Sequence, residues 1–566
     1  MARRLSSPAF IGRTSELASL QRAAEAADDG RPSLLLLGGE AGVGKSRLLG
    51  ELIADRGASG WLVLEGATIA VGAEGLPFEP VAAALRSAVR ALGQERVAEV
   101  AGPSLPDLAR LLPELAGSRD QVPLALTQAE WLQVRTFEGV LGLLDRLGAE
   151  SAVLLVIEDA HWADRSTRDL LSFLARNVRD ERLLIVVSFR TDELHRRHPL
   201  VGWLAEVERL PRVERVDLAR FDRGELAELL GGILGTRPSA ALVDSIAARS
   251  DGNAFFAEEL VSGLDDAGAG RLPATVREIV IARLAALPEP AARLVEVAAV
   301  AGREVDHEVL AEVAGLADLG ILDALRDAVA SHLLVAVTDG RQEPYRFRHA
   351  LVQVAVYDDM LPSDRRQLHG SYARAIAARE TPGVAGSASR LAELAHHWSA
   401  AHEPDRALLA SVAAADAARS GFAFAEAAGH YERATELWDV VPEADRPADR
   451  DLAGLYDAAS AMVALVGDPA RAIALAERAI EELDRDPGAG QVERRAAARE
   501  RLGRAAAEHW RREHALEHMA DDYRRLVSRA LESDVPHPTL PPHLLDDGGR
   551  VLEGVTRQFG LQPPLR

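Results

Sequence analysis

The stretch GEAGVGKS, Gly39 to Ser46, decides the fold of this chain of 566 residues. It follows an apolar run, Leu34 to Leu37, and a helical pattern opens at Ser46. The spacing matches G-x-x-x-x-G-K-S/T, a loop whose backbone N–H groups turn inward around a triphosphate. Lys45 is expected to reach the β- and γ-phosphates and Ser46 to hold Mg²⁺, while the positive end of the following helix attracts the phosphates. The glycines that allow the loop its conformation are Gly39, Gly42 and Gly44.

Lys45 is also the only lysine of the chain, which has 65 Lys and Arg residues in total. Arginine therefore serves at every other position that needs a strongly basic side chain. A compact, flexible ammonium fits between phosphates where a planar guanidinium does not. The composition thus favours a phosphate-binding role for Lys45 over the alternative, a Gly-rich turn that matches the motif by accident.

Composition restricts the class of protein. The net charge of −22 argues against a chain that by itself clamps DNA or an anionic membrane surface. The chain has no cysteine, which excludes a disulfide framework and a thiolate metal site. No run approaches the roughly 18 apolar residues of a membrane span, and the N-terminus lacks an apolar core of signal-peptide length. We therefore expect a cytoplasmic protein that does not use a membrane, with about three to five domains for its length.

A second chemical signal is the stretch SAVLLVIEDAHWAD, Ser151 to Asp164. Its apolar run, Val153 to Ile157, is typical of a strand that is buried on both faces of a parallel sheet. The run ends in Glu158 and Asp159, at the carboxyl end of the strand, where such sheets bind ligands. One carboxylate can hold Mg²⁺ while the other polarises an attacking water. Strand alternation favours Glu158 for the metal and Asp159 for the water, with the exchanged roles still open; two surface acids are the alternative.

The remaining apolar runs complete the predicted core. A strand that begins at Leu183 ends at Arg190, whose guanidinium could reach a γ-phosphate; a surface arginine is the alternative. A last strand near Glu214 to Leu218 would give the core five strands. Apolar runs that alternate with helices predict an α/β doubly wound parallel sheet with helices on both faces. Candidates to cap the helix after the acidic pair are Asp164, Ser166 and Thr167.

From about residue 220 the pattern becomes helical. Two strand-like segments, LLVAVTDG from Leu333 and YRFRHAL from Tyr345, follow three helices, an order that suits a winged-helix module. Further on, AFAEAAGHYERATEL (423–437) and DPARAIALAERAIEEL (468–483) place small residues alike, as in tetratricopeptide arrays, with a spacing longer than the usual period of about 34 residues. The predicted domains are a P-loop ATPase core (1–218), a helical lid subdomain (219–275), a winged-helix-like domain (276–365), degenerate tetratricopeptide-like repeats (366–530) and a Pro/Gly-rich tail (531–566).

Taken in order, these segments resemble the ATP-binding half of the large LuxR-type transcriptional regulators. These regulators are a branch of the AAA/STAND class, the signal-transduction ATPases with numerous domains, which includes the maltose-regulon activator. Several motifs are weak alone, but their common order over about residues 9–440 is specific. The motifs are FIGRTSEL, GEAGVGKSRLL, Leu-Pro-Phe before a helix, LLVIEDAHWAD, SFRTDEL, GNAFFAEEL, LPATVREIVIARL, YRFRHALV, LHGSYARAI, AELAHHW and HYERATELW.

The resemblance implies that ATP converts a closed ADP form into an open, self-associating form and that slow hydrolysis resets the switch. It implies that Arg190 senses the γ-phosphate and that the Ile-Gly-Arg segment ending at Arg13 lies against the adenine; an ordinary capped helix is the alternative for that segment. By looser analogy, His349 in the wing would contact the β-phosphate and lock the ADP form; a core histidine is the alternative. The implied nucleotide-binding residues are Gly39, Gly42, Gly44, Lys45, Ser46, Arg47, Arg13 and His349, and the implied catalytic residues are Glu158, Asp159 and Arg190, with Ser46 and Glu158 on Mg²⁺.

The chain departs from the family pattern in two ways. It has Gly252-Asn253-Ala254 where the family has Gly-Asn-Pro, which removes a proline that would stiffen the lid near the nucleotide. Family members also continue to a LuxR-type helix-turn-helix, and no DNA-binding domain is recognised in this sequence. We therefore expect a truncated or split regulator that passes its output to another protein.

Three functions fit these features. The preferred one is a nucleotide-operated switch that binds ATP or ADP with Mg²⁺, self-associates in the ATP form and receives an unidentified protein or small-molecule inducer at the helical repeats. The second is a conventional ATPase or kinase, although no phosphoryl-acceptor site is visible. The third is a helical-repeat scaffold in which the nucleotide is only structural. In each case DNA binding is expected to be absent or weak and strongly dependent on salt.

Overall fold

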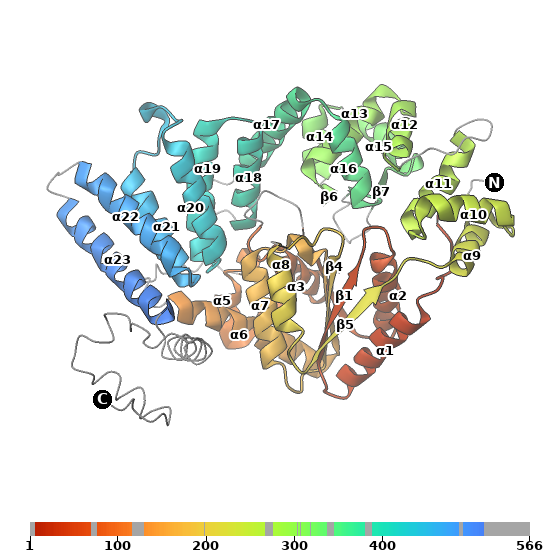
Figure 1. The fold of residues 1–566 in the computed structure, drawn as a ribbon, viewed down its shortest axis with the longest axis horizontal. Coiled ribbons are helices and arrows are strands. Elements are labelled where there is room, and N and C mark those ends of the chain that lie inside the picture. Colours follow the sequence, from red (N-terminus) through yellow and green to blue (C-terminus); the bar gives the residue numbers. More distant parts are fainter. Residues whose placement is uncertain are drawn as a thin grey trace, which may run out of the picture. The chain divides into compact units, whose positions relative to one another are not determined.

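The computed structural model (Figure 1) describes residues 6–68, 76–115, 129–196, 198–266, 276–302, 304–305, 307–316, 318–336, 345–379, 388–485 and 491–513. The chain divides into two compact units, Met1–Arg499 and Glu500–Arg566. All elements below belong to the first unit except α23 (Gln491–Glu513), which spans the boundary. The predicted helical segment beyond residue 513 and the predicted tail lie outside the described residues.

The core of the first unit is a parallel sheet of β1 (Ser33–Gly39), β2 (Leu62–Ala67), β3 (Val153–Glu158), β4 (Leu183–Arg190) and β5 (Val213–Leu218). Its order is β2-β3-β4-β1-β5, which confirms the predicted five-stranded α/β core. β4 is buried along its whole length, as its continuous apolar run predicts. In the register of β1 and β4, Gly39 lies opposite Arg190. The phosphate loop and Arg190 therefore leave the sheet at the same edge.

Helices cover both faces of this sheet (Figure 1). On one face, Leu20 and Leu48 pack with the strand residues Leu35, Leu154 and Leu184. The other face is covered by α3 and α6, which contact β2, β3 and β4. The helices are α1 (Thr14–Asp28), α2 (Lys45–Ala58), α3 (Glu79–Leu92), α4 (Gln94–Ala101), α5 (Leu105–Leu108), α6 (Ala129–Glu150), α7 (Arg165–Asn177) and α8 (Pro199–Val207).

A group of three helices follows β5: α9 (Arg223–Leu234), α10 (Ala240–Ser250) and α11 (Ala254–Asp266). Their shared core contains Leu230 and Ile246, together with Val261. This group occupies the described part of the predicted lid, and the end of the lid, 267–275, lies outside the described residues.

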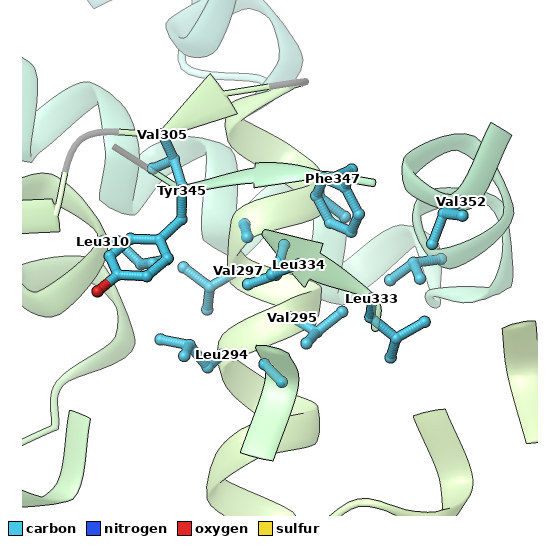
Figure 2. Close-up of a cluster of buried hydrophobic side chains, with 14 of the residues drawn as sticks. Leu294, Val295, Val297, Val305, Leu310, Leu333, Leu334, Tyr345, Phe347 and Val352 are labelled. Carbon is cyan, nitrogen blue, oxygen red and sulfur yellow. The ribbon is translucent and has the colours of Figure 1, made fainter. Parts of the chain in front are cut away.

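A second group surrounds a small antiparallel sheet of β6 (Glu304–Val305), β7 (Leu334–Ala336) and β8 (Tyr345–Phe347), in the order β6-β8-β7. Figure 2 shows the apolar side chains of this sheet, among them Leu334 and Phe347, in one cluster with Val295 and Val297 of α13. β6 was not predicted, because two residues are too few to show an alternating pattern. The helices are α12 (Val276–Ala286), α13 (Glu289–Ala301), α14 (His307–Ala314), α15 (Asp318–Ala330) and α16 (Ala350–Asp359).

The next elements are α17 (Pro362–Ala378), α18 (Ala388–Ala400), α19 (Pro404–Ser420), α20 (Phe424–Trp438), α21 (Leu452–Leu465) and α22 (Pro469–Arg485). We call α18 to α22 the helical array. Each of its helices packs against the next one along the chain. Ala414 and Ala434 are fully buried between neighbours, which agrees with the prediction that small residues let the helices approach closely. The assignment to tetratricopeptide-like repeats and the domain boundaries stay predictions.

Among the described residues, no helix combines the length and the apolar composition that a membrane span requires.

Candidate phosphate-binding site

The loop between β1 and α2 has the backbone conformation that its glycines predict. Gly42 has φ +79° and Gly44 has φ +110°, values that side chains rarely tolerate. A Cβ on Gly42 would also lie 2.8 Å from Asn253 Oδ1 and 2.8 Å from Phe255 Cβ. Gly42 is therefore required both for the turn and for the close approach of the chain that precedes α11.

The loop also fits an anion. α2 begins at Lys45, so the N–H groups of its first turn have no acceptor within the helix. A Cβ on Gly44 would meet nothing within 4 Å, which places this part of the loop beside open space. Free N–H groups at a helix start, next to open space and a lysine, form a site that suits phosphate oxygens.

Lys45 lies inside this loop and is only 7% exposed. Its Nζ donates to the backbone oxygens of Gly39 at 2.7 Å and Glu40 at 2.9 Å. Burial lowers the pKa of Lys45 to about 8, opposed in part by the nearby Asp159 carboxylate. The ammonium is therefore held at the loop and can turn toward a phosphate.

Ser46 and Glu158, the two predicted Mg²⁺ ligands, lie side by side. The Ser46 hydroxyl donates to Glu158 Oε2 at 2.6 Å. A hydroxyl and a carboxylate in contact offer the oxygen ligands that Mg²⁺ prefers, beside the loop that would hold the phosphates. The structure thus brings the predicted pair together, and its role in metal binding stays a prediction.

Asp159 follows the end of β3. Its backbone adopts the left-handed conformation, with φ 56°, and its N–H donates to the hydroxyl of Ser188 on β4 at 3.1 Å. Its carboxylate lies 3.7 Å from Arg190 Nε. The hydrogen bond of Glu158 to Ser46 and the ion pair of Asp159 with Arg190 involve different partners, while the division of labour between the two carboxylates stays a prediction.

Arg190 is buried at the end of β4 and forms an ion pair with Glu193. Its guanidinium also lies 4.9 Å from the centre of the Trp162 ring. Two residues further on, Asp192 Oδ1 accepts a hydrogen bond from the N–H of Ala41 at 3.0 Å. A carboxylate thus holds the backbone of the phosphate loop from the neighbouring strand. The sequence analysis gave no role to Asp192, although its place just past a strand at the ligand-binding edge was a usable signal.

The segment before α11 also holds the loop. Asn253 Nδ2 donates to the oxygen of Ala41 at 2.8 Å, and the N–H of Phe255 donates to the oxygen of Gly42 at 3.0 Å. α11 begins at Ala254, and Asn253 Oδ1 also accepts from the N–H of Phe256 at 3.3 Å. The sequence analysis identified the motif GNAFFAEEL but did not predict its hydrogen bonds to the phosphate loop.

The other predicted nucleotide-binding residues lie at different distances from the loop. Arg13 is buried, donates to the oxygen of Val43 at 3.2 Å and lies 4.7 Å from the centre of the Phe221 ring. Arg47 is half exposed on α2 and pairs with Glu51 at 3.2 Å. Arg13 thus contacts the loop directly. Arg47 forms an ion pair with Glu51 on the surface of α2.

His349 caps α16, where its Nδ1 accepts from the N–H of Leu351 at 3.2 Å. Its ring stacks on Phe255, with the ring centres 4.1 Å apart. His349 lies two residues past the end of β8, and the assignment of this region to a winged helix stays a prediction. His349 reaches the phosphate loop through Phe255 in this structure, and a direct contact with a β-phosphate stays a prediction.

Arg348, the residue before His349, connects the segment between β8 and α16 to α11. Arg348 forms ion pairs with Glu258 at 2.6 Å and with Glu259 at 3.0 Å. Glu259 is completely buried and also pairs with Arg283 of α12 at 2.7 Å. A buried carboxylate between two guanidinium groups links α11 firmly to the helices and strands that follow it.

Residues 9–187 match the family model of the AAA ATPase domain. The chain is 25% identical over 514 residues to an uncharacterized protein of Rhizobium meliloti (strain 1021). The aligned region covers 84% of this chain and 47% of that protein. It therefore spans about half the length of this curated relative.

Two solved structures align with the chain at low similarity. The first is a signal transduction ATPase with numerous domains (STAND) that has a tetratricopeptide repeat sensor, from Pyrococcus horikoshii. It is 12% identical, with a TM-score of 0.41, over 94% of this chain and 79% of that chain. The second is the Drosophila ORC bound to AT-rich DNA and Cdc6, at 11% identity and a TM-score of 0.20, over 61% of this chain and 92% of that chain. The AAA ATPase match covers the phosphate loop and the acidic pair, so the candidate site lies in a domain that resembles nucleotide-binding ATPases.

Proposed function

We propose that this chain is a cytoplasmic signal-transduction ATPase that works as a nucleotide-operated switch, of the kind found in LuxR-type transcriptional regulators. The observation that carries the proposal is the contact of the 253–255 segment with the phosphate loop. Asn253 and Phe255 hydrogen-bond the loop backbone, and Phe255 stacks on His349. A change in the loop on nucleotide binding would therefore move α11 and the small sheet region together.

The residues of the site have the chemistry for binding and slow hydrolysis of ATP. Lys45 and the first N–H groups of α2 would bind the phosphates, and Arg13 would lie beside the adenine base of the nucleotide. Mg²⁺ held by Ser46 and Glu158 would supply positive charge to the phosphate oxygens. Asp159 would orient the attacking water, and Arg190 would contact the γ-phosphate.

The ammonium of Lys45 links binding to loop geometry. In the present structure it donates to Gly39 and Glu40, which are carbonyl acceptors of the loop itself. A phosphate would attract it more strongly than these neutral oxygens, because hydrogen bonds between ions are stronger than those to neutral groups. The loop would then lose two internal hydrogen bonds, and the segments that hold it, at Asp192 and at 253–255, would adjust.

As a switch, the protein needs a difference in affinity rather than tight binding. To move the population from 1:99 to 99:1, ATP must favour the open form by about 10⁴-fold, or about 5.5 kcal/mol. We propose that the open form self-associates and that the helical array receives a protein or small-molecule inducer. The output would then pass to a partner.

The mass of the protein in solution tests this proposal. We expect one mass with Mg²⁺ and ADP and a mass at least twice as large with Mg²⁺ and a non-hydrolysable ATP analogue, measured by light scattering after size-exclusion chromatography. Nucleotide without Mg²⁺ is the control. The same mass in both nucleotide states, with binding verified by calorimetry, would contradict the switch.

The contact of Asn253 with the loop gives a second prediction. Asn253→Ala removes the hydrogen bond to Ala41, and we expect ADP to dissociate about tenfold faster, the equivalent of one buried hydrogen bond. Stopped-flow release of a fluorescent ADP analogue measures this rate. Asn177→Ala is a matched control, because Asn177 Nδ2 donates to Phe173 within its own helix. Equal release rates for Asn253→Ala and the wild type would count against the role of this segment.

A further inference from the structure

The first turn of α7 is capped by a carboxylate from the helical array. Glu426 of α20 accepts hydrogen bonds from the N–H groups of Arg165 at 2.8 Å and Ser166 at 3.2 Å. The Ser166 hydroxyl donates to the same carboxylate at 2.5 Å. Glu426 is 2% exposed, so these bonds replace those that water would otherwise make. A negative charge at a helix N-terminus is also favoured by the helix dipole.

Neighbouring contacts extend this junction. The Arg165 guanidinium donates to the oxygen of Val466, past the end of α21, at 2.9 Å. Arg110 lies 4.8 Å from the centre of the Phe422 ring and donates to the oxygen of Ser420 at 3.2 Å. Glu426 is thus the buried ionic centre of a contact between the helical array and the ATPase core.

The start of α7 lies close in sequence to the acidic pair. One short turn, Ala160–Trp162, separates Asp159 from the segment that leads into α7. The N–H of Trp162 donates to the oxygen of Asp159 at 3.0 Å, so this connection is tightly hydrogen-bonded. A displacement at the start of α7 would therefore reach the residue that is proposed to orient the attacking water.

A second carboxylate lies at the same helix start. Asp164, the predicted cap of α7, accepts from the N–H of Thr167 at 2.8 Å and is buried. Burial and the nearby Glu426 raise the pKa of Asp164 to about 7. Two carboxylates at one helix start repel each other when both are ionised. The other charged or titratable groups around the pair are Arg165, Arg168 and Asp169 of α7 and the buried His430 one turn further along α20.

From this geometry we infer that Glu426 is a releasable intramolecular ligand of the α7 N-terminus. While it is seated, the helical array stays closed on the ATPase core; when it leaves, the start of α7 and the acidic pair are released. The inference rests on the proposed function, because it names the contact through which the helical array and the nucleotide site would regulate each other.

The seated form is expected to become more stable in acid. Without Glu426 nearby and with access to water, Asp164 should titrate nearer its ordinary range, below its value in the seated form. Between the pKa of Asp164 in the released form and its pKa in the seated form, the seated form binds more protons, so a lower pH favours it. The effect levels off above about pH 7. From pH 8 to pH 6 the ratio of seated to released protein should rise about tenfold.

Hydrogen exchange of the nucleotide-free protein tests the inference. In Glu426→Ala, the protection factors of the amides of Arg165 and Ser166 should fall at least tenfold, since they lose their acceptor. In Glu426→Gln, an amide oxygen can still accept, so protection at pH 8 should remain. Its dependence on pH should weaken, because the repulsion by Glu426 is lost while burial still raises the pKa of Asp164. Glu436→Ala is the control, because Glu436 lies on the same helix, is exposed and pairs with Arg433. That variant should match the wild type.

Unchanged protection in Glu426→Ala, or a wild-type pH dependence in Glu426→Gln, would overturn the inference. If Glu426→Ala unfolds, Ser166→Ala takes its place: it removes one donor, and the protection of the Arg165 amide should fall about fivefold. The measurement needs no nucleotide, so its failure is distinct from that of the proposed function. Suppose that Glu426→Ala loses the protection of these amides but the wild type shows no ATP-dependent change of mass. The contact of Glu426 with α7 would then stand, and the proposed nucleotide switch would be refuted.

Discussion

A Lys45→Ala protein is expected to bind ATP about 100-fold more weakly than the wild type. Hydrogen bonds to charged groups contribute about 1.5–3 kcal/mol each, and the ammonium of Lys45 is the only one of its kind at the loop. Alanine has a high helix propensity, so the first turn of α2 should still form. The loss should therefore come from the missing charge rather than from unfolding.

Calorimetry with Mg²⁺ and ATP measures this affinity, and a thermal melt verifies the fold. Arg31→Ala is the control for the loss of a basic side chain, because Arg31 is exposed and pairs with Asp29. Lys45→Arg is the sharper variant, since it keeps the charge and changes only its shape. It should also bind weakly if a compact ammonium is required. ATP binding by Lys45→Ala at wild-type strength would refute the assignment of the loop.

The same variant separates the three functions that fit the sequence. A switch should lose ATP-dependent assembly together with binding. A conventional ATPase should lose turnover while its assembly is unaffected by the mutation. A scaffold with a structural nucleotide should mainly lose thermal stability.

An Asp159→Asn protein should keep ATP bound but hydrolyse it about 10²–10⁴-fold more slowly, the usual range for loss of a general base. Asparagine tolerates the left-handed backbone that Asp159 adopts, so the turn should persist. The N–H of Asp159 would still donate to Ser188, while the attraction of the side chain to Arg190 and to Lys45 would weaken. Because hydrolysis resets the switch, this variant should accumulate in the associated form when ATP is supplied.

Phosphate release under single-turnover conditions measures the rate, and light scattering measures the assembly. Asp180→Asn makes the same chemical change at an exposed position after α7 and should behave as the wild type. Glu158→Gln should differ from Asp159→Asn by weakening the dependence on Mg²⁺, since Glu158 contacts Ser46. Wild-type hydrolysis by Asp159→Asn would assign the water-orienting role to another residue.

Much of the ATPase core could be predicted because its signals are local. Continuous apolar runs marked the buried strands, and the residues at their ends marked the edge where ligands bind. Asp164 was a predicted cap, and its side chain does accept from the N–H of Thr167. The two-residue strand β6 escaped because it depends on pairing with Tyr345 and Arg346, which lie far along the chain.

The contacts that hold the loop could not be predicted, because they join distant segments. Asp192 reaches Ala41 across 151 residues, and Asn253 reaches it across 212 residues. Neither side chain has a periodic pattern that would identify its partner. The stack of His349 on Phe255 likewise depends on how α11 and α16 meet, which no local spacing specifies.

The cap of α7 has a consequence for synthesis on the ribosome. Glu426 follows Ser166 by 260 residues, and ribosomes add about 5–20 residues per second. The start of α7 is therefore translated roughly 10–50 s before the carboxylate that caps it. During that interval the N–H groups of Arg165 and Ser166 lack the acceptor that Glu426 later supplies, so water must serve them until α20 has been made.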